Sequence, residues 1–209
     1  MYVSSRRAGE RTMGLMRRLF ARLRLRVNEA KSAVDLAQKR KILGYSFWIG
    51  AGRTVKLRVA RKAIDALKNR IRITTRRSGG RGITQVVAEL REYLPGWSRY
   101  FALAETPNVF GDVDKWLRHR LRALHLKQWK RGRTVFREMR NRGASVDVAK
   151  TVAANTRRWW RNSAMHLQSV LTTRYFDELG VPRLRPVTST SRTARCGPAR
   201  RVVWEGPPA

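Results

Sequence analysis

Arginine and lysine side chains have the clearest capacity for chemistry in this sequence, and they are densest between Asp112 and Arg133. An arginine guanidinium can donate paired hydrogen bonds to a phosphate, and it also stacks on nucleobases. The cations of this stretch greatly outnumber its acids, and they are Lys115, Arg118, Arg120, Arg122, Lys127, Lys130 and Arg131. Because a helix with so many like charges repels itself, the pattern indicates a polyanionic partner.

An apolar stripe in the same stretch predicts the helix that positions these cations. Trp116 lies beside the stripe, and Asp112 and Asp114 stand at the expected helix start, where negative charge suits the helix dipole. The stripe, at helical spacing, consists of Val113, Leu117, Leu121 and Leu124. The leucines are therefore expected to face a core while the arginines face outward.

The whole chain shares this bias. Its 209 residues include 47 Lys and Arg against 14 Asp and Glu, which gives a formal net charge of +33 and a sequence pI of about 11.9. Such a chain is expected to bind nucleic acid. The alternative, a basic face that is merely solvated, is less favoured at this charge density.

Several classes of site are excluded by the inventory of side chains. Cys196 is the single cysteine, so neither an intramolecular disulfide nor a multi-thiolate zinc site is possible. His119 and His125 are six residues apart and do not share a helix face, so no metal is predicted, and both are expected at the surface or facing RNA. No apolar run approaches the roughly 18 residues of a membrane helix. The prediction is a cytoplasmic protein without a membrane partner.

Two further segments combine cations with features suited to RNA. In the glycine-rich loop at residues 76–82, glycine lets the backbone follow RNA closely; the alternative is a mobile surface loop. Trp159 and Trp160 stand between arginines, so one ring can be buried while the other faces RNA. Trp97, Tyr100 and Phe101 are expected in the core. The residues predicted to bind RNA are Arg76, Arg77, Arg81, Arg118, Arg120, Arg122, Lys127, Lys130, Arg131, Arg133, Arg157, Arg158 and Arg161.

The predicted fold is mainly α, with a small α+β part at the N-terminus. A helix is predicted at residues 6–25, and a β-hairpin pairs residues 41–49 with 53–57 through Gly50–Gly52. Helices follow from residue 59, with a kink or break at Pro95, caps at Ser145 and Ser163, and an end at Gly180. The expected divisions are residues 1–58, residues 59–182, and a disordered basic tail at 183–209.

Several segments together resemble the group II intron-encoded reverse transcriptase/maturase proteins. LPGWSRYF (residues 94–101) and WLRHRLRALHLKQWKR (residues 116–131) look like two blocks of the maturase-specific domain, also called domain X or the thumb. LQSVLTTRYFDELGV (residues 167–181) resembles its terminal helix. RLRVNEAKS (residues 24–32) and KILGYSF (residues 41–47) resemble the last palm motifs. The resemblance covers roughly residues 2–182 and implies the end of a palm followed by a helical thumb.

The resemblance also assigns roles, and one departure limits them. Family polymerases carry a Tyr-x-Asp-Asp sequence just before the helix that starts here at Arg6, and its aspartates hold two magnesium ions. This chain has no such pair, so no catalytic residue and no cofactor are predicted, and Mg²⁺ is expected only for an intact polymerase. Lys31 matches a palm lysine near the departing pyrophosphate, although an ordinary loop is favoured for this chain. Leu43, Gly44, Tyr45 and Phe47 match the primer grip, and a purely structural hairpin is the alternative.

The function implied by this resemblance is binding of structured group II intron RNA to help it fold and splice. One alternative is part of an RNA-directed DNA polymerase, active only if the missing palm is supplied; another is an inert truncated gene product. Target DNA is a possible further partner, and a homodimer is possible. A DNA endonuclease is excluded because such domains need clustered His, Cys or Asn ligands after the thumb, and residues 183–209 offer only Cys196 of these.

Overall fold

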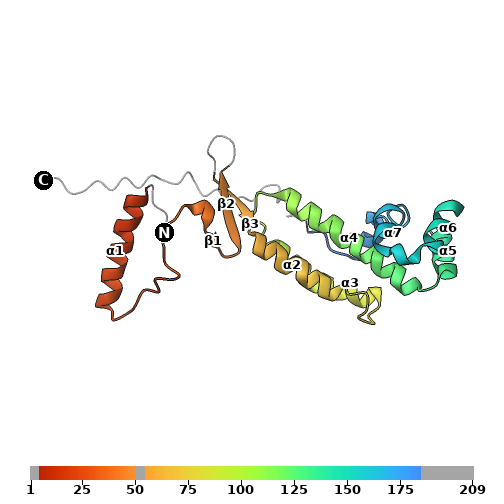
Figure 1. The fold of residues 1–209 in the computed structure, drawn as a ribbon, viewed down its shortest axis with the longest axis horizontal. Coiled ribbons are helices and arrows are strands. Elements are labelled where there is room, and N and C mark those ends of the chain that lie inside the picture. Colours follow the sequence, from red (N-terminus) through yellow and green to blue (C-terminus); the bar gives the residue numbers. More distant parts are fainter. Residues whose placement is uncertain (1–4, 50–54, 185–209) are drawn as a thin grey trace.

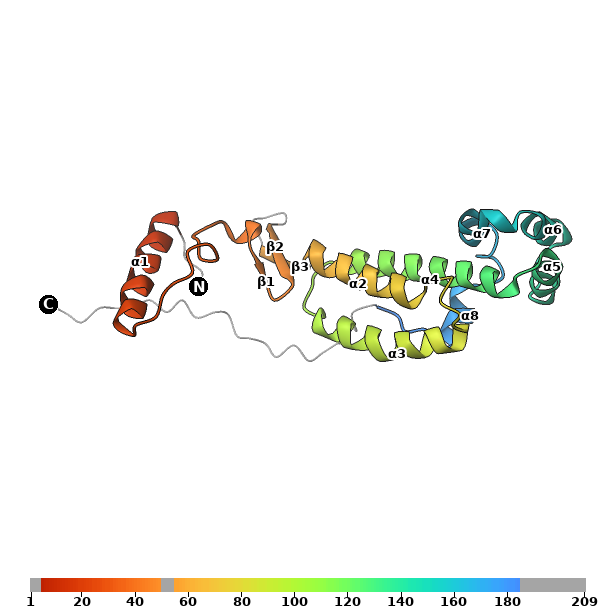
Figure 2. The same cartoon turned by 60° about the horizontal axis from the view of Figure 1, so that its bottom comes forward.

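The computed structural model describes residues 5–49 and 55–184, and they form an elongated, mainly helical molecule with a small antiparallel sheet (Figure 1). The N-terminal helix lies at one end, three long helices fill the middle, and a group of shorter helices forms the other end (Figure 2). This confirms the predicted fold class. The predicted tail from residue 185 onward lies outside the described residues. No helix in the described part has the length and apolar content to cross a membrane.

Helix α1 (Arg6–Arg22) confirms the first predicted helix. The Ser5 side chain caps it by accepting a hydrogen bond from the Ala8 amide at 3.2 Å. Its apolar side chains remain largely exposed, as Leu15 and Leu19 show, and the C-cap residue Leu23 is exposed too; only Gly9 of the helix is buried. The loop that follows ends in a short 3₁₀ helix, η1 (Ala37–Lys39).

The sheet contains β1 (Lys41–Ile42), β2 (Tyr45–Ile49) and β3 (Val55–Val59), paired antiparallel in that order. The predicted first strand is therefore two strands, because Leu43 and Gly44 both adopt positive φ angles, of 52° and 80°, and reverse the chain. The predicted antiparallel hairpin is present, but Phe47 pairs with Leu57 and the second strand runs to Val59, two residues past its predicted end. The predicted connection at Gly50–Gly52 lies outside the described residues.

Helices α2 (Arg61–Thr74), α3 (Ile83–Tyr100) and α4 (Pro107–Trp129) enclose the main core. The predicted stripe is confirmed, since Leu117 and Leu121 are fully buried and Val113 and Leu124 nearly so. Helix α4 begins earlier than predicted, because Pro107 occupies its first turn, where a missing amide hydrogen is tolerated. Helix α3 passes through Pro95 without interruption, since Leu94 and Trp97 pack into the core on both sides of the proline.

The far end of the molecule contains α5 (Gly132–Asn141), α6 (Val146–Ala154), the 3₁₀ helix η3 (Thr156–Arg158) and α7 (Trp159–Met165). Ser145 caps α6 as predicted. The predicted cap at Ser163 is wrong: this residue is buried inside α7, where its hydroxyl donates to the Trp160 carbonyl at 2.8 Å. Thr172 instead caps α8 (Thr173–Glu178).

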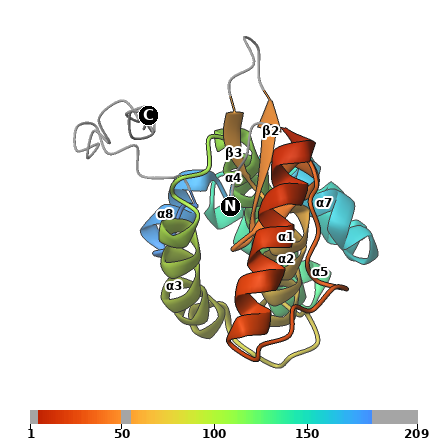
Figure 3. The same cartoon turned by 90° about the vertical axis from the view of Figure 1, so that its left-hand side faces the viewer.

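After α8, the chain returns along the central helices. Gly180, with a φ of 86°, turns the chain after α8, as predicted. The Leu184 amide then donates to both carboxylate oxygens of Asp114 at 3.1 Å, so the end of the described chain is fixed to α4. Viewed end-on, α3 and α8 lie on one side of the molecule and α7 on the other (Figure 3).

Candidate nucleic-acid interface

The arginines of α4 fall into two groups that the sequence does not distinguish. Arg118 and Arg122, one turn apart, are buried, with 4% and 6% exposure. Arg118 forms ion pairs with Asp114 at 3.4 Å and Asp177 at 3.0 Å, and the Arg122 Nε donates to the Leu171 carbonyl at 2.8 Å. These two guanidiniums join α4 to the segment around α8, so the outward orientation expected for them is wrong.

The two carboxylates that face Arg118, those of Asp114 and Asp177, also accept hydrogen bonds from residues after α8. Asp114 is part of the buried contact, although the sequence suggested a helix-dipole role at the surface. Burial raises the pKa of Asp114, while the Leu184 amide and Arg118 oppose that rise. The pKa of Asp177 is lowered, chiefly by its hydrogen bond with Arg183 and also by Arg118. The contact is therefore a network of two acids and two arginines.

The Trp116 ring is the centre of a second, outward-facing group on α4. Three cationic groups lie over this ring: the Lys68 Nζ at 5.8 Å, the Arg72 Cζ at 5.5 Å and the Arg120 Cζ at 5.3 Å from its centroid. Arg120 is held there because its Nε donates to the Thr75 hydroxyl at 2.7 Å. Helices α2 and α4 thus present cations around one aromatic ring.

A second aromatic group continues from His119, which follows Trp116 by one turn of α4. The His119 ring stacks against Trp160 with centroids 3.7 Å apart, and Trp160 contacts Trp159 edge-on at 5.5 Å. The Arg77 guanidinium lies over the Trp159 ring at 3.9 Å. The predicted glycine-rich loop is therefore connected to α7 through this cation–π contact.

These residues form one feature, which we call the aromatic–cation surface: Lys68, Arg72, Arg77, Trp116, His119, Arg120, Trp159 and Trp160. Among the described residues, no acid forms an ion pair with any of its four cations. Burial, and after it the charge of Arg72, lowers the pKa of Arg120; burial also lowers that of Arg77. Like charges are thus held close together without a compensating carboxylate.

The other predicted RNA-binding residues surround this surface or serve local contacts. Arg81 is engaged within the fold, since its Nη1 lies 2.6 Å from Glu89. Most of the others are exposed at the ends of α4, α5, η3 and α7. The exposed group consists of Arg76, Lys127, Lys130, Arg131, Arg133, Arg157, Arg158 and Arg161.

The primer-grip-like turn is tied to the end of α3. Leu43 projects into solvent, whereas the Tyr45 hydroxyl donates to the Tyr100 carbonyl and the Tyr100 hydroxyl donates to the Leu43 carbonyl at 2.9 Å. A Cβ on Gly44 would lie only 3.0 Å from the Phe101 ring. The turn is therefore set by contacts with the helical part. Phe47 is half-buried in β2, and Lys31 is exposed in the loop after α1.

His125 does not lie at the surface, as the sequence suggested. It is 4% exposed among Trp129, Tyr175 and Phe176, and its Nε2 is 3.3 Å from the Tyr175 hydroxyl. Burial lowers its pKa to about 4. His119, by contrast, contributes to the aromatic–cation surface. The described residues contain no group of three or more His, Cys, Asp or Glu side chains that could hold a metal ion.

The sequence did not indicate Lys68, Arg72 and Trp116 as members of the candidate interface, whereas His119 was expected at the surface or facing RNA. Their signal is weak, because a lysine and an arginine four residues apart on a basic helix resemble any solvated face. Only the packing of α2 against α4 places both beside Trp116.

A comparison with known protein families finds a match for the middle of the chain. Residues 64–143, which include α3, α4, α5 and most of α2, match the family described as "Group II intron, maturase-specific domain". A search among curated proteins gives no match. The match covers the Trp116 block, with Lys68, Arg72 and Arg77. Residues 64–143 of this chain are therefore similar to the group II intron maturase-specific domain, which agrees with the resemblance to maturase/reverse transcriptase proteins.

Proposed function

We propose that this protein binds folded group II intron RNA through the aromatic–cation surface and assists the RNA in reaching its splicing-competent fold. The family assignment supports the class of RNA, and the geometry of the surface supports the mode of binding. In this proposal residues 59–182 act as the RNA-binding thumb, and residues 1–58 as a palm-like extension.

The observation that carries the proposal is the gathering of unpaired cations around the Trp116 ring. Lys68, Arg72 and Arg120 come from two helices, yet all three lie within 6 Å of the same ring centroid. Holding like charges together costs free energy, and phosphate oxygens would recover it. A face that served only solubility would not need its cations to converge.

The proposed role follows from the electrostatics of RNA folding. Helices of a structured RNA must approach one another despite their phosphates, and bound cations lower that repulsion. Arginine and lysine contacts to phosphate set position and affinity rather than sequence, so selectivity comes from the shape of the folded RNA. The chemistry of splicing belongs to the RNA in this proposal.

Charge reversal on α2 tests the proposed surface. The double variant Lys68→Glu/Arg72→Glu changes two cations of the surface, whereas the control Arg61→Glu/Lys62→Glu makes the same charge change at the other end of the helix. Filter binding to a folded group II intron RNA is measured over a series of salt concentrations. In a plot of log affinity against log salt concentration, we expect the slope of the first variant to be less steep by about 0.7–0.9 for each lost phosphate contact. The slope of the control should stay that of the wild type.

Two results would contradict the proposal. If both double variants bind equally well, or wild-type affinity does not depend on salt, the surface is not a phosphate-binding site. If the wild-type protein binds an unrelated structured RNA as tightly as the intron at moderate salt, the proposed selectivity is wrong.

A further inference from the structure

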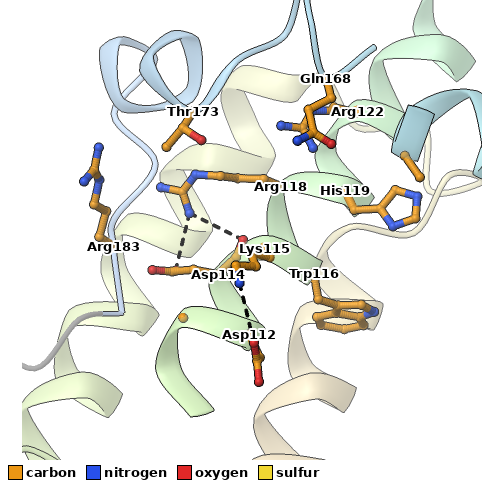
Figure 4. Close-up of a pocket in the computed structure, with 12 residues that line it drawn as sticks. Asp112, Asp114, Lys115, Trp116, Arg118, His119, Arg122, Gln168, Thr173 and Arg183 are labelled. Carbon is orange, nitrogen blue, oxygen red and sulfur yellow. Dashed lines mark hydrogen bonds and ion pairs between the residues drawn. The ribbon is translucent and has the colours of Figure 1, made fainter. Parts of the chain in front are cut away.

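A pocket of about 550 Å³ lies directly beside the aromatic–cation surface, between α4 and residues 164–183 (Figure 4). Trp116 and His119 belong to both features, because they also line this pocket. The volume falls in the range of small-molecule sites, roughly 300–1,000 Å³. The pocket therefore offers room for a group much larger than a single phosphate.

The wall next to the pocket is an aromatic ledge formed by Trp160 and His119. Trp160 is 39% exposed, and the two rings are inclined by only 31°. The His119 Nε2 is 2.9 Å from the Trp160 carbonyl, which can only accept, so Nε2 carries a hydrogen and donates it to that carbonyl. The histidine ring is thereby fixed while an exposed indole stays beside it.

The remaining pocket lining mixes hydrogen-bond donors and acceptors. Arg118 lines the pocket, and its buried Nε has no hydrogen-bond partner. Asp112 and Gln168 are exposed side chains that contribute acceptors, and Lys115 contributes an exposed ammonium group. Lys115 and Asp112 form an exposed ion pair at 3.9 Å, so the rim of the pocket offers both a cation and an acceptor, and the edge of a nucleobase likewise carries both donors and acceptors. The lining fits a base together with its sugar-phosphate.

We infer that the pocket and ledge bind one unpaired nucleotide of an RNA, with its base stacked on an outer face of the Trp160–His119 ring pair. This inference rests on the proposed RNA binding and adds to it a preference for an unstacked base. Aromatic stacking accepts any base, so the site selects an exposed base rather than a sequence. Lys115, whose exposed ion pair with Asp112 at 3.9 Å is weak, is the group that meets the phosphate of this nucleotide.

Fluorescence anisotropy with two short RNA hairpins tests the inference on the full chain. One hairpin is fully paired, and the other is identical except for a single bulged adenosine. We expect the wild-type protein to bind the bulged hairpin at least about 5-fold more tightly, the least that stacking of one base is worth. Trp160→Ala and His119→Ala should bind both hairpins equally, and Trp160→Phe should restore part of the preference.

Trp48→Ala is the matched control, because the 38% exposure of Trp48 is close to the 39% of Trp160, but Trp48 lies on β2. This variant should keep the preference for the bulged hairpin. Equal binding of both hairpins by the wild-type protein would overturn the inference alone, as would a preference that survives in both alanine variants. Failure to bind either hairpin would instead overturn the proposed RNA binding itself.

Discussion

Arg118 connects α4 to α8, and its charge stabilises the fold. Its side chain is 5% exposed and lies between Asp114 and Asp177. Breaking a buried ion pair by removing one partner leaves an uncompensated charge, which is costly. A variant that reverses Arg118, Arg120 and Arg122 together would therefore disturb the fold as well as any RNA contact.

Replacement of Arg118 by methionine should strongly destabilise the protein. We expect a loss of about 3 kcal/mol in the free energy of unfolding, measured by urea denaturation, because Asp114 remains buried without its arginine. Arg133→Met on the exposed side of α5 is the control and should change stability by less than about 0.5 kcal/mol. An equal effect of both substitutions would show that the buried network does not stabilise the fold.

His125 makes stability depend on pH in a defined direction. The folded protein holds its pKa at about 4, below the ordinary value of 6.5, because the ring is buried. Between these two values the unfolded chain binds a proton that the folded protein does not. The stability that the neutral, buried His125 ring contributes is therefore fully present above the pKa of this residue in the unfolded chain. It is lost as the pH falls toward the pKa in the folded protein.

From about pH 7 to about pH 5, His125 should reduce the free energy of unfolding by about 2 kcal/mol. His125→Gln retains a hydrogen-bonding side chain but does not titrate, so its stability should fall less over the same interval. Urea denaturation of both proteins at the two pH values gives the difference. Parallel losses in the two proteins would show that His125 is not protonated on unfolding.

At the scale of elements, the turn between β1 and β2 shows how the small sheet is joined to the helical part. Leu43 and Gly44 reverse the chain, the Gly44 carbonyl accepts from the Ala60 amide at 2.8 Å, and Tyr45 and Tyr100 exchange hydrogen bonds with the opposite backbone. These contacts place the primer-grip-like turn directly against the last turn of α3. Movement of the hairpin would therefore require these bonds to break.

Gly44→Ala should destabilise this junction, since the residue has a φ of 80° and its Cβ would approach the Phe101 ring at 3.0 Å. We expect a cost of about 1–3 kcal/mol in thermal or urea unfolding. Gly14→Ala in the interior of α1 is the control, because a Cβ there meets nothing within 4 Å. That substitution should be neutral or stabilise by up to about 1 kcal/mol. Equal behaviour of the two alanines would contradict the role of Gly44.

At the scale of the whole molecule, charge and shape act together. The chain has a net charge of +33, and arginine or lysine residues occur in every one of the helices α1 to α8 of this elongated molecule (Figure 2). Long-range attraction for RNA therefore does not depend on one patch. The aromatic–cation surface differs from the rest because cations and rings converge there from α2, α4, α7 and the loop at residues 76–82. In this proposal the overall positive charge attracts the RNA, and the aromatic–cation surface positions it.

The sequence alone determined the charge, the helical periodicity and the leucine stripe of α4, because these depend on residue type and on neighbours within one turn. Tertiary structure alone decided which arginines of α4 face outward. Arg118 and Arg122 are buried because Asp177 and Leu171, about fifty residues further along the chain, dock on their face of α4. Arg120 is placed beside Trp116 because α2 packs on the adjacent face. Both sets of contacts join residues far apart in the sequence, so the local spacing of residues in α4 cannot predict them.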